Sequence, residues 1–257
     1  MSDGTLIGVI LTVVQIAVLF AVILPCVRMM LRGKSTLISV FFCLAMGSYL
    51  FSNLYWLVYD CIRPDTRMPF AVNEFAECAM ILLLSAGLER VLSDEKRVAW
   101  EIFLSFAFIG ANIALWILWS SEWIQDILFG IPYVYLLWLI VRGLRSRDIL
   151  PKKERLGIAL IQFLILVLEF VSLISVDVES ALLIPLLVII FACLGWLLFR
   201  SIKTRDVFVT SAFFLCTLLA MFSLSEPWYN IAMAADTVAI PILYLSVMKE
   251  RDRDDIR

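Results

Sequence analysis

Residues 5–27 read TLIGVILTVVQIAVLFAVILPCV, a stretch in which no side chain is charged. Residues 35–59 read STLISVFFCLAMGSYLFSNLYWLVY and are also free of charge. Because an α-helix rises about 1.5 Å per residue, about 20 apolar residues cross the roughly 30 Å of hydrocarbon in a bilayer. Two uncharged stretches of this length in succession predict transmembrane helices and an all-α membrane protein.

The composition of the whole chain agrees with lipid as its solvent. The chain has 257 residues, of which 63% are hydrophobic and 17% charged, and its mean hydropathy is +0.97. A soluble domain contains about 45–50% apolar residues, so this composition excludes a soluble globular enzyme, a disordered chain and a secreted disulfide scaffold. The net charge is −2, and no basic tract is long enough for nucleic acid.

The residue types that usually carry chemistry are scarce. The sequence contains no histidine, which removes the commonest general base, the usual pH switch and the commonest metal ligand. The six cysteines form no CxxC pair, and the Walker A, HExxH and GxSxG motifs are absent. We therefore expect no metal site and no cofactor.

Seven further stretches are mostly apolar and long enough to be spans. They cover residues 70–91, 101–121, 124–144, 156–176, 180–199, 207–225 and 227–248. The stretch 124–144 is the weakest, because only residues 127–141 of it are uncharged. The sequence thus predicts a polytopic bundle of about nine transmembrane helices, forming one membrane domain over residues 1–257 with no soluble domain.

Basic residues are unevenly distributed between the connectors. If the N-terminus lies outside, all of the 21 Lys and Arg residues except Arg63 and Arg67 fall on the inner side. Such an excess is the positive-inside pattern of membrane proteins. Without the span 124–144 the alternation fails for every later connector, so we expect nine spans, with the N-terminus outside and the C-terminus inside. We expect an integral protein of a bacterial plasma membrane.

Five polar side chains share one depth in the predicted bundle. Asn53, Glu77, Asn112, Glu169 and Asp236 each lie about seven or eight residues inward of the outer end of a different span. At 1.5 Å per residue, this places them all about 10–12 Å below the outer boundary. An ionisable residue in a span costs about 2.5–3.5 kcal/mol, so these groups should face protein or water rather than lipid.

The spacing of neighbouring polar residues places them on shared helix faces. Asn73 and Glu74 lie four and three positions before Glu77, so all three can share a face. A second stripe is formed by Asn53, Trp56 and Asp60 at i, i+3 and i+7. We expect an outward-opening, acid-lined cavity between the second, third, sixth and ninth spans, with the fourth as an additional wall. The candidate ligand- or cation-binding residues are Asn53, Trp56, Asp60, Asn73, Glu74, Glu77, Glu169 and Asp236.

No Lys or Arg accompanies the deeper acids in their spans. Arg63 and Arg67 are the only outer cations, and they form a candidate lid over the cavity. The acids can be protonated, can hold a cation or amine, or can be covered by these two arginines. A further interpretation is that the carboxyls only form hydrogen bonds between helices.

The inner connector between the fifth and sixth spans is the most basic segment. Lipid headgroups attract such residues by about 1 kcal/mol each, so anionic headgroups at the inner loops are the expected partners. Docking of a cytoplasmic partner is the alternative. The residues in question are Arg142, Arg145, Arg147, Lys152, Lys153 and Arg155.

Two classes of function fit the one-sided polarity. We favour binding or sensing of a small cationic ligand from outside, because the polar layer occupies one leaflet only. The alternative is a secondary transporter or channel for a proton, a metal ion or an organic cation, with the ninth span kinked at Pro241. A third hypothesis is an intramembrane hydrolase that uses Glu77, Glu169 or Asp236 as acid or base, so the sequence favours a non-enzymatic role without deciding it.

Overall fold

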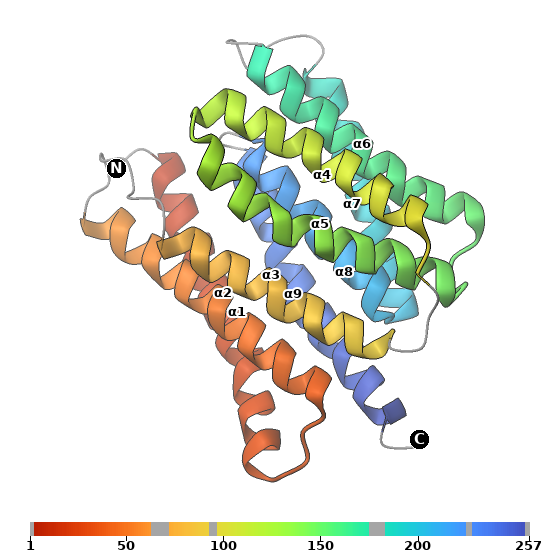
Figure 1. The fold of residues 1–257 in the computed structure, drawn as a ribbon. Coiled ribbons are helices and arrows are strands. Elements are labelled where there is room, and N and C mark those ends of the chain that lie inside the picture. Colours follow the sequence, from red (N-terminus) through yellow and green to blue (C-terminus); the bar gives the residue numbers. More distant parts are fainter. Residues whose placement is uncertain (1–2, 63–71, 93–96, 175–182, 225–227, 255–257) are drawn as a thin grey trace.

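The computed structural model describes residues 3–62, 72–92, 97–174, 183–224 and 228–254, and these residues form nine helices and no strand. The all-α fold is therefore confirmed. Figure 1 shows the helices packed as one bundle, in which α1 begins near one end and α9 finishes near the opposite end. The helices are α1 Asp3–Leu31, α2 Leu37–Ile62, α3 Val72–Val91, α4 Ala99–Ser120, α5 Trp123–Ser146, α6 Lys152–Ile174, α7 Leu183–Thr204, α8 Val207–Phe222 and α9 Trp228–Asp254.

Seven of the described helices, all except α3 and α8, are long and apolar enough to cross a membrane. The helix α3 carries three glutamates and one arginine, which lower its hydropathy. The helix α8 has only 16 residues, fewer than the about 20 that a span needs. A membrane-spanning bundle is thus supported, and the count of nine spans stays a prediction.

The helix α8 occupies the centre of the bundle. It contacts α5, α6, α7 and α9, and every residue from Val207 to Ala220 is buried. Its sequence is apolar on all sides, as expected for a helix that meets protein on every face. Its start is fixed by Asp206, whose Oδ1 accepts hydrogen bonds from the backbone N–H groups of Phe208 (3.0 Å) and Val209 (3.2 Å).

The outer helices present apolar side chains to the surroundings. Leu31, Phe103, Phe51 and Phe163 are all more than half exposed. Exposed apolar area on this scale is unfavourable in water and is normal for a surface that contacts lipid.

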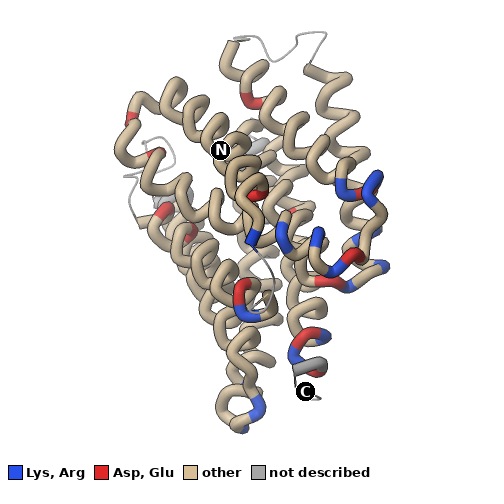
Figure 2. Tube along the Cα trace, turned by 45° about the vertical axis from the view of Figure 1, so that its right-hand side comes forward, with Lys and Arg blue, Asp and Glu red and all other residues tan. Residues whose placement is uncertain are grey.

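Charged residues are segregated along the bundle. Figure 2 shows Lys and Arg gathered toward the end at which α9 finishes, in the part of the chain that the structure describes. We call this the basic end. The segregation matches the pattern on which the predicted orientation rests.

Candidate functional site

A cavity of about 320 Å³ opens among the ends of the helices opposite the basic end. Five helices line it. The lining residues are Gly8, Val9, Thr12 and Gln15 of α1, Tyr49, Ser52, Asn53 and Trp56 of α2, Asn73 and Glu77 of α3, Leu218, Met221 and Phe222 of α8, and Tyr229, Asn230 and Met233 of α9.

Asp236 lies fully buried directly behind the wall of this cavity. Its Oδ2 accepts hydrogen bonds from Tyr49 Oη (2.7 Å) and Gln15 Nε2 (2.9 Å), and its Oδ1 accepts one from Thr217 Oγ1 (3.0 Å). Gln15 Nε2 also reaches Tyr49 Oη at 3.3 Å. These bonds join α1, α2, α8 and α9 and fix the side chains that form the floor of the cavity.

Glu77 is the carboxylate that lines the cavity itself. Its Oε1 accepts a hydrogen bond from the hydroxyl of Tyr133 on α5. Beside it, the hydroxyl of Ser52 donates to Asn73 Oδ1. No lysine or arginine belongs to the lining formed by the described residues, so no basic side chain of the lining neutralises Glu77.

Asn230 is a further polar residue of the lining. Its side chain is only 7% exposed, and its buried Oδ1 has no hydrogen-bond partner among the described residues. A buried acceptor without a partner costs about 1–3 kcal/mol. By contrast, the amide nitrogen of Asn53 donates to the backbone carbonyl of Tyr49 (3.0 Å).

Aromatic rings form much of the remaining wall. Trp56, Tyr49, Tyr229 and Phe222 contribute rings from α2, α8 and α9. The Trp56 side chain is 41% exposed, so it stands near the mouth. Aromatic faces attract cations through their quadrupoles, and aromatic rings with a few polar groups are typical of small-molecule sites.

Four of the predicted ligand-binding residues come together in this cavity: Asn53, Trp56, Asn73 and Glu77. Asp236 adjoins it through Tyr49 and Gln15. The side chain of Asp60 and the predicted lid residues Arg63 and Arg67 lie outside the described residues.

Two predicted residues lie elsewhere. Glu74 accepts a hydrogen bond from Gln125 Nε2 of α5 (2.6 Å) and is not part of the lining. The Glu169 carboxyl lies beside the indole of Trp116 on α4, and its Oε2 has no hydrogen-bond partner. The ring of Trp116 packs against Tyr133 (6.0 Å between centroids) and Phe222 (5.7 Å), the same two residues that flank Glu77 and the cavity.

The walls also differ from the expectation. The second, third and ninth helices contribute as predicted, but α1 and α8 replace the sixth and fourth. Gln15 and Thr12, which bring α1 to the cavity, are neutral residues in a very apolar helix, and Asn230 follows two aromatic residues typical of a membrane interface. Sequence offered only one signal for them, namely that each is a polar residue in or beside a predicted span.

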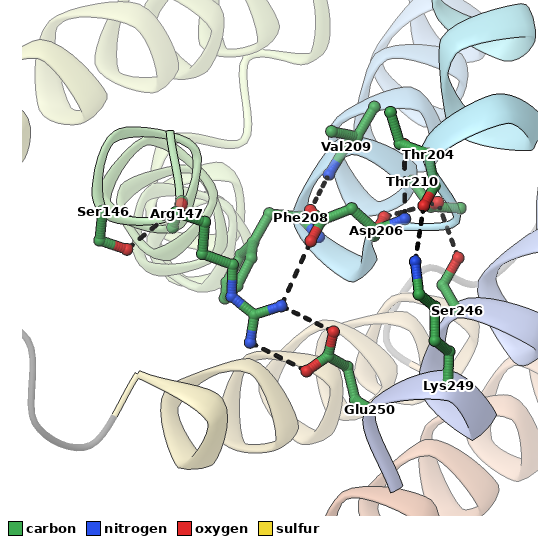
Figure 3. Close-up of polar contacts among 11 residues, drawn as sticks. Ser146, Arg147, Thr204, Asp206, Phe208, Val209, Thr210, Ser246, Lys249 and Glu250 are labelled. Carbon is green, nitrogen blue, oxygen red and sulfur yellow. Dashed lines mark hydrogen bonds and ion pairs between the residues drawn. The ribbon is translucent and has the colours of Figure 1, made fainter. Parts of the chain in front are cut away.

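The basic end contains a network of ion pairs, drawn in Figure 3. The two terminal nitrogens of Arg147 bind the carboxylate of Glu250 at 2.6 and 2.9 Å, and Nη1 also contacts Asp206 Oδ2 at 3.2 Å. Lys249 Nζ donates to the backbone carbonyl of Thr204 (2.9 Å). Burial lowers the pKa of the Arg147 guanidinium, but the hydrogen bonds and charges of Glu250 and Asp206 outweigh burial and raise it above its usual value.

The six basic residues predicted to contact lipid or a partner fall into three groups. Arg142 is buried, and its Nη2 donates a hydrogen bond to the backbone carbonyl of Leu92 (3.1 Å). Its side chain therefore does not reach the surface, contrary to the prediction. Arg145, Arg147 and Arg155 are half-buried and form ion pairs with Glu101, Glu250 and Asp148, respectively. Only Lys152 and Lys153 are exposed.

The chain shows no match to a protein-family model, to a curated protein or to a solved structure. Within the described residues, no group of three or more His, Cys, Asp or Glu side chains is placed to hold a metal ion.

Proposed function

We propose that the protein is a multi-pass membrane protein that binds a small organic cation in the cavity opposite the basic end. Binding or sensing is its role in this proposal, and the cavity faces the outside. The membrane character is supported by the seven long apolar helices. The ligand class is inferred from the cavity lining.

The observation that carries the proposal is the Glu77 carboxyl in a lining whose described residues include no lysine or arginine. A ligand ammonium group donates hydrogen bonds and carries positive charge, so it complements this carboxyl. An anionic ligand would meet no basic side chain in the described lining.

The aromatic wall favours an organic cation over a bare metal ion. Trp56 and Tyr229 provide ring faces on the same cavity as Glu77. Cation–π attraction to desolvated rings is worth about 2 kcal/mol and is the usual means of binding alkylammonium groups. A volume of about 320 Å³ lies at the lower end of the range of small-molecule pockets, about 300–1,000 Å³.

The residues below the cavity favour binding over transport. On α9 the buried positions between Thr237 and Ser246 are all apolar, namely Ala239, Ile240, Ile242 and Leu243. On α8 the corresponding positions include Phe213 and Phe214. A pathway for an ion needs polar groups or water along its length, and this apolar layer supplies neither.

The test is a pair of matched substitutions on α3. Glu77 and Glu89 both accept a hydrogen bond from a tyrosine of α5, but only Glu77 lines the cavity. We expect methylammonium, dimethylammonium or trimethylammonium to raise the unfolding temperature of the purified protein in detergent. Glu77→Gln should weaken binding by about tenfold or more, and Glu89→Gln should leave it unchanged.

Two results would contradict this proposal. If none of the three cations stabilises the wild-type protein, or if both substitutions weaken binding equally, the cavity is not the binding site. Accumulation of the bound cation in proteoliposomes by counterflow would replace binding or sensing with the transport alternative.

A further inference from the structure

A second cavity, of about 460 Å³, lies at the basic end between α4, α5 and α6, with α8 behind it. Its walls are apolar side chains, among them Leu104 and Phe108 of α4, Leu137 of α5 and Ala159 of α6. It shares no lining residue with the first cavity. An apolar cavity of this size needs an apolar occupant, because water gains few hydrogen bonds there.

The charged groups of this cavity are concentrated at one end. Arg145, Lys152 and Arg155 belong to its lining and come from the end of α5 and the start of α6. Arg155 Nη1 donates to the backbone carbonyls of Leu144 and Arg145, both at 3.3 Å, which holds its guanidinium at this end.

The three cations differ in how far they are neutralised. Arg145 pairs with the fully buried Glu101, while Arg155 pairs with Asp148 (3.0 Å), whose side chain is 81% exposed. Exposed pairs are weak and can be shared with a competing anion. Lys152 is exposed and has no interaction with any residue that the structure describes. A net positive charge therefore stands at the end of an apolar cavity.

The length of the cavity matches one leaflet of a bilayer. Along α6 the lining runs from Lys152 to Gln162, which corresponds to about 15 Å at 1.5 Å per residue. The hydrocarbon core of a bilayer is about 30 Å thick, so one leaflet is about 15 Å. Leu156, which also lines the cavity, is 71% exposed, so the cavity is continuous with the apolar outer surface of the bundle.

We propose that this cavity binds one anionic phospholipid, with its phosphate held by Lys152 and Arg155 and one acyl chain between α4, α5 and α6. The charge selects an anionic headgroup, and the apolar walls select a chain rather than a water-soluble phosphate. The site is separate from the proposed cation site, because it uses other helices and lies at the other end of the bundle.

Lipid retention measured by native mass spectrometry tests this proposal on the full-length protein. The protein is purified in detergent and mixed with equal amounts of phosphatidylglycerol and phosphatidylcholine. We expect one phosphatidylglycerol to be retained in preference to phosphatidylcholine. Lys152→Ala should weaken this retention about fivefold, whereas Lys153→Ala, which removes an adjacent exposed charge outside the lining, should change it less than twofold.

A second pair of variants tests the acyl chain. Ala159→Phe fills the cavity and leaves every charge in place, so it should abolish the selective retention. Ala114→Phe adds the same ring at an exposed position of α4 outside the lining and should have no effect. Equal losses for Lys152→Ala and Lys153→Ala, or undiminished retention in Ala159→Phe, would overturn the proposal in favour of general surface attraction.

Discussion

Replacement of Asp236 by alanine should destabilise the bundle measurably. Three hydrogen bonds end on this carboxyl, from Gln15, Tyr49 and Thr217, and each comes from a different helix. Hydrogen bonds between membrane helices contribute about 0.6 kcal/mol each on average, so three of them amount to about 2 kcal/mol.

The three donors would be affected unequally. After the substitution, Thr217 Oγ1 still donates a hydrogen bond to the backbone carbonyl of Phe214 (2.8 Å). Gln15 Nε2 still donates one to Tyr49 Oη (3.3 Å). The hydroxyl of Tyr49 has no other acceptor among the described residues and would be stranded, which costs about 1 kcal/mol or more. We therefore expect Asp236→Ala to lower the free energy of unfolding by about 2–3 kcal/mol.

Equilibrium unfolding in mixed micelles of sodium dodecyl sulfate and dodecyl maltoside measures this difference. In a Tyr49→Phe background, Asp236→Ala should lower the free energy of unfolding by about 1 kcal/mol less than it does in the wild-type protein, because no hydroxyl is left stranded. Tyr244→Phe is the control, since no hydrogen bond joins the Tyr244 hydroxyl to the part of the chain that the structure describes. Additive effects of Asp236→Ala and Tyr49→Phe would refute the reasoning.

Three further predictions concern the packing, the basic end and the orientation. Arg147→Ala removes the ion pairs with the buried carboxylates of Glu250 and Asp206 and should cost about 3 kcal/mol in the same unfolding assay; an effect below 1 kcal/mol would contradict the ion-pair network. Gly143→Ala places a methyl group against the ring of Phe208 and should destabilise by about 1–3 kcal/mol, whereas Gly195→Ala meets open space and should stabilise by up to about 1 kcal/mol. Cys61 is exposed in the last turn of α2, so a membrane-impermeant thiol reagent should label it from outside in intact cells, and labelling only in inverted vesicles would reverse the predicted orientation.

The sequence predicts how deep a residue lies along its span, but it does not predict which way the side chain points around the helix axis. Glu77, Glu169 and Asp236 were assigned to one layer because depth follows from a fixed rise per residue. Glu169 nevertheless lies beside Trp116 rather than in the cavity. Rotation about the axis depends on packing with neighbours, and uniformly apolar spans carry little pattern to reveal it.

The same limit explains why α1 and α8 were missed as walls. Gln15 is one neutral side chain in a helix that is otherwise among the most apolar, and nothing local indicates its contact with Asp236, which is 221 residues away. For α8, apolar residues on every face are compatible both with burial among other helices and with a membrane span, so the pattern does not distinguish the two. In the structure α8 is short and enclosed by four other helices, so its burial is confirmed.

The composition of the basic connector predicts positive charge but not the partner of each side chain. Six basic residues between the fifth and sixth spans predict a contact surface for lipid or a partner. Two of the arginines pair with acids from other segments, Arg145 with Glu101 and Arg147 with Glu250, and Arg155 pairs with Asp148 of the same connector. Glu101 and Glu250 lie near the ends of their helices, and pairing within the protein offsets part of the desolvation of both charges.

Thiol accessibility of the cavity lining tests the central claim most directly. In a protein whose six native cysteines have been replaced, Asn53→Cys and Asn230→Cys should react with an impermeant reagent added from outside, and Glu169→Cys should not. A saturating organic cation should protect the first two positions. Absence of labelling at Asn53→Cys and Asn230→Cys in folded protein, or labelling that occurs only from the inner side, would contradict an outward-facing binding cavity.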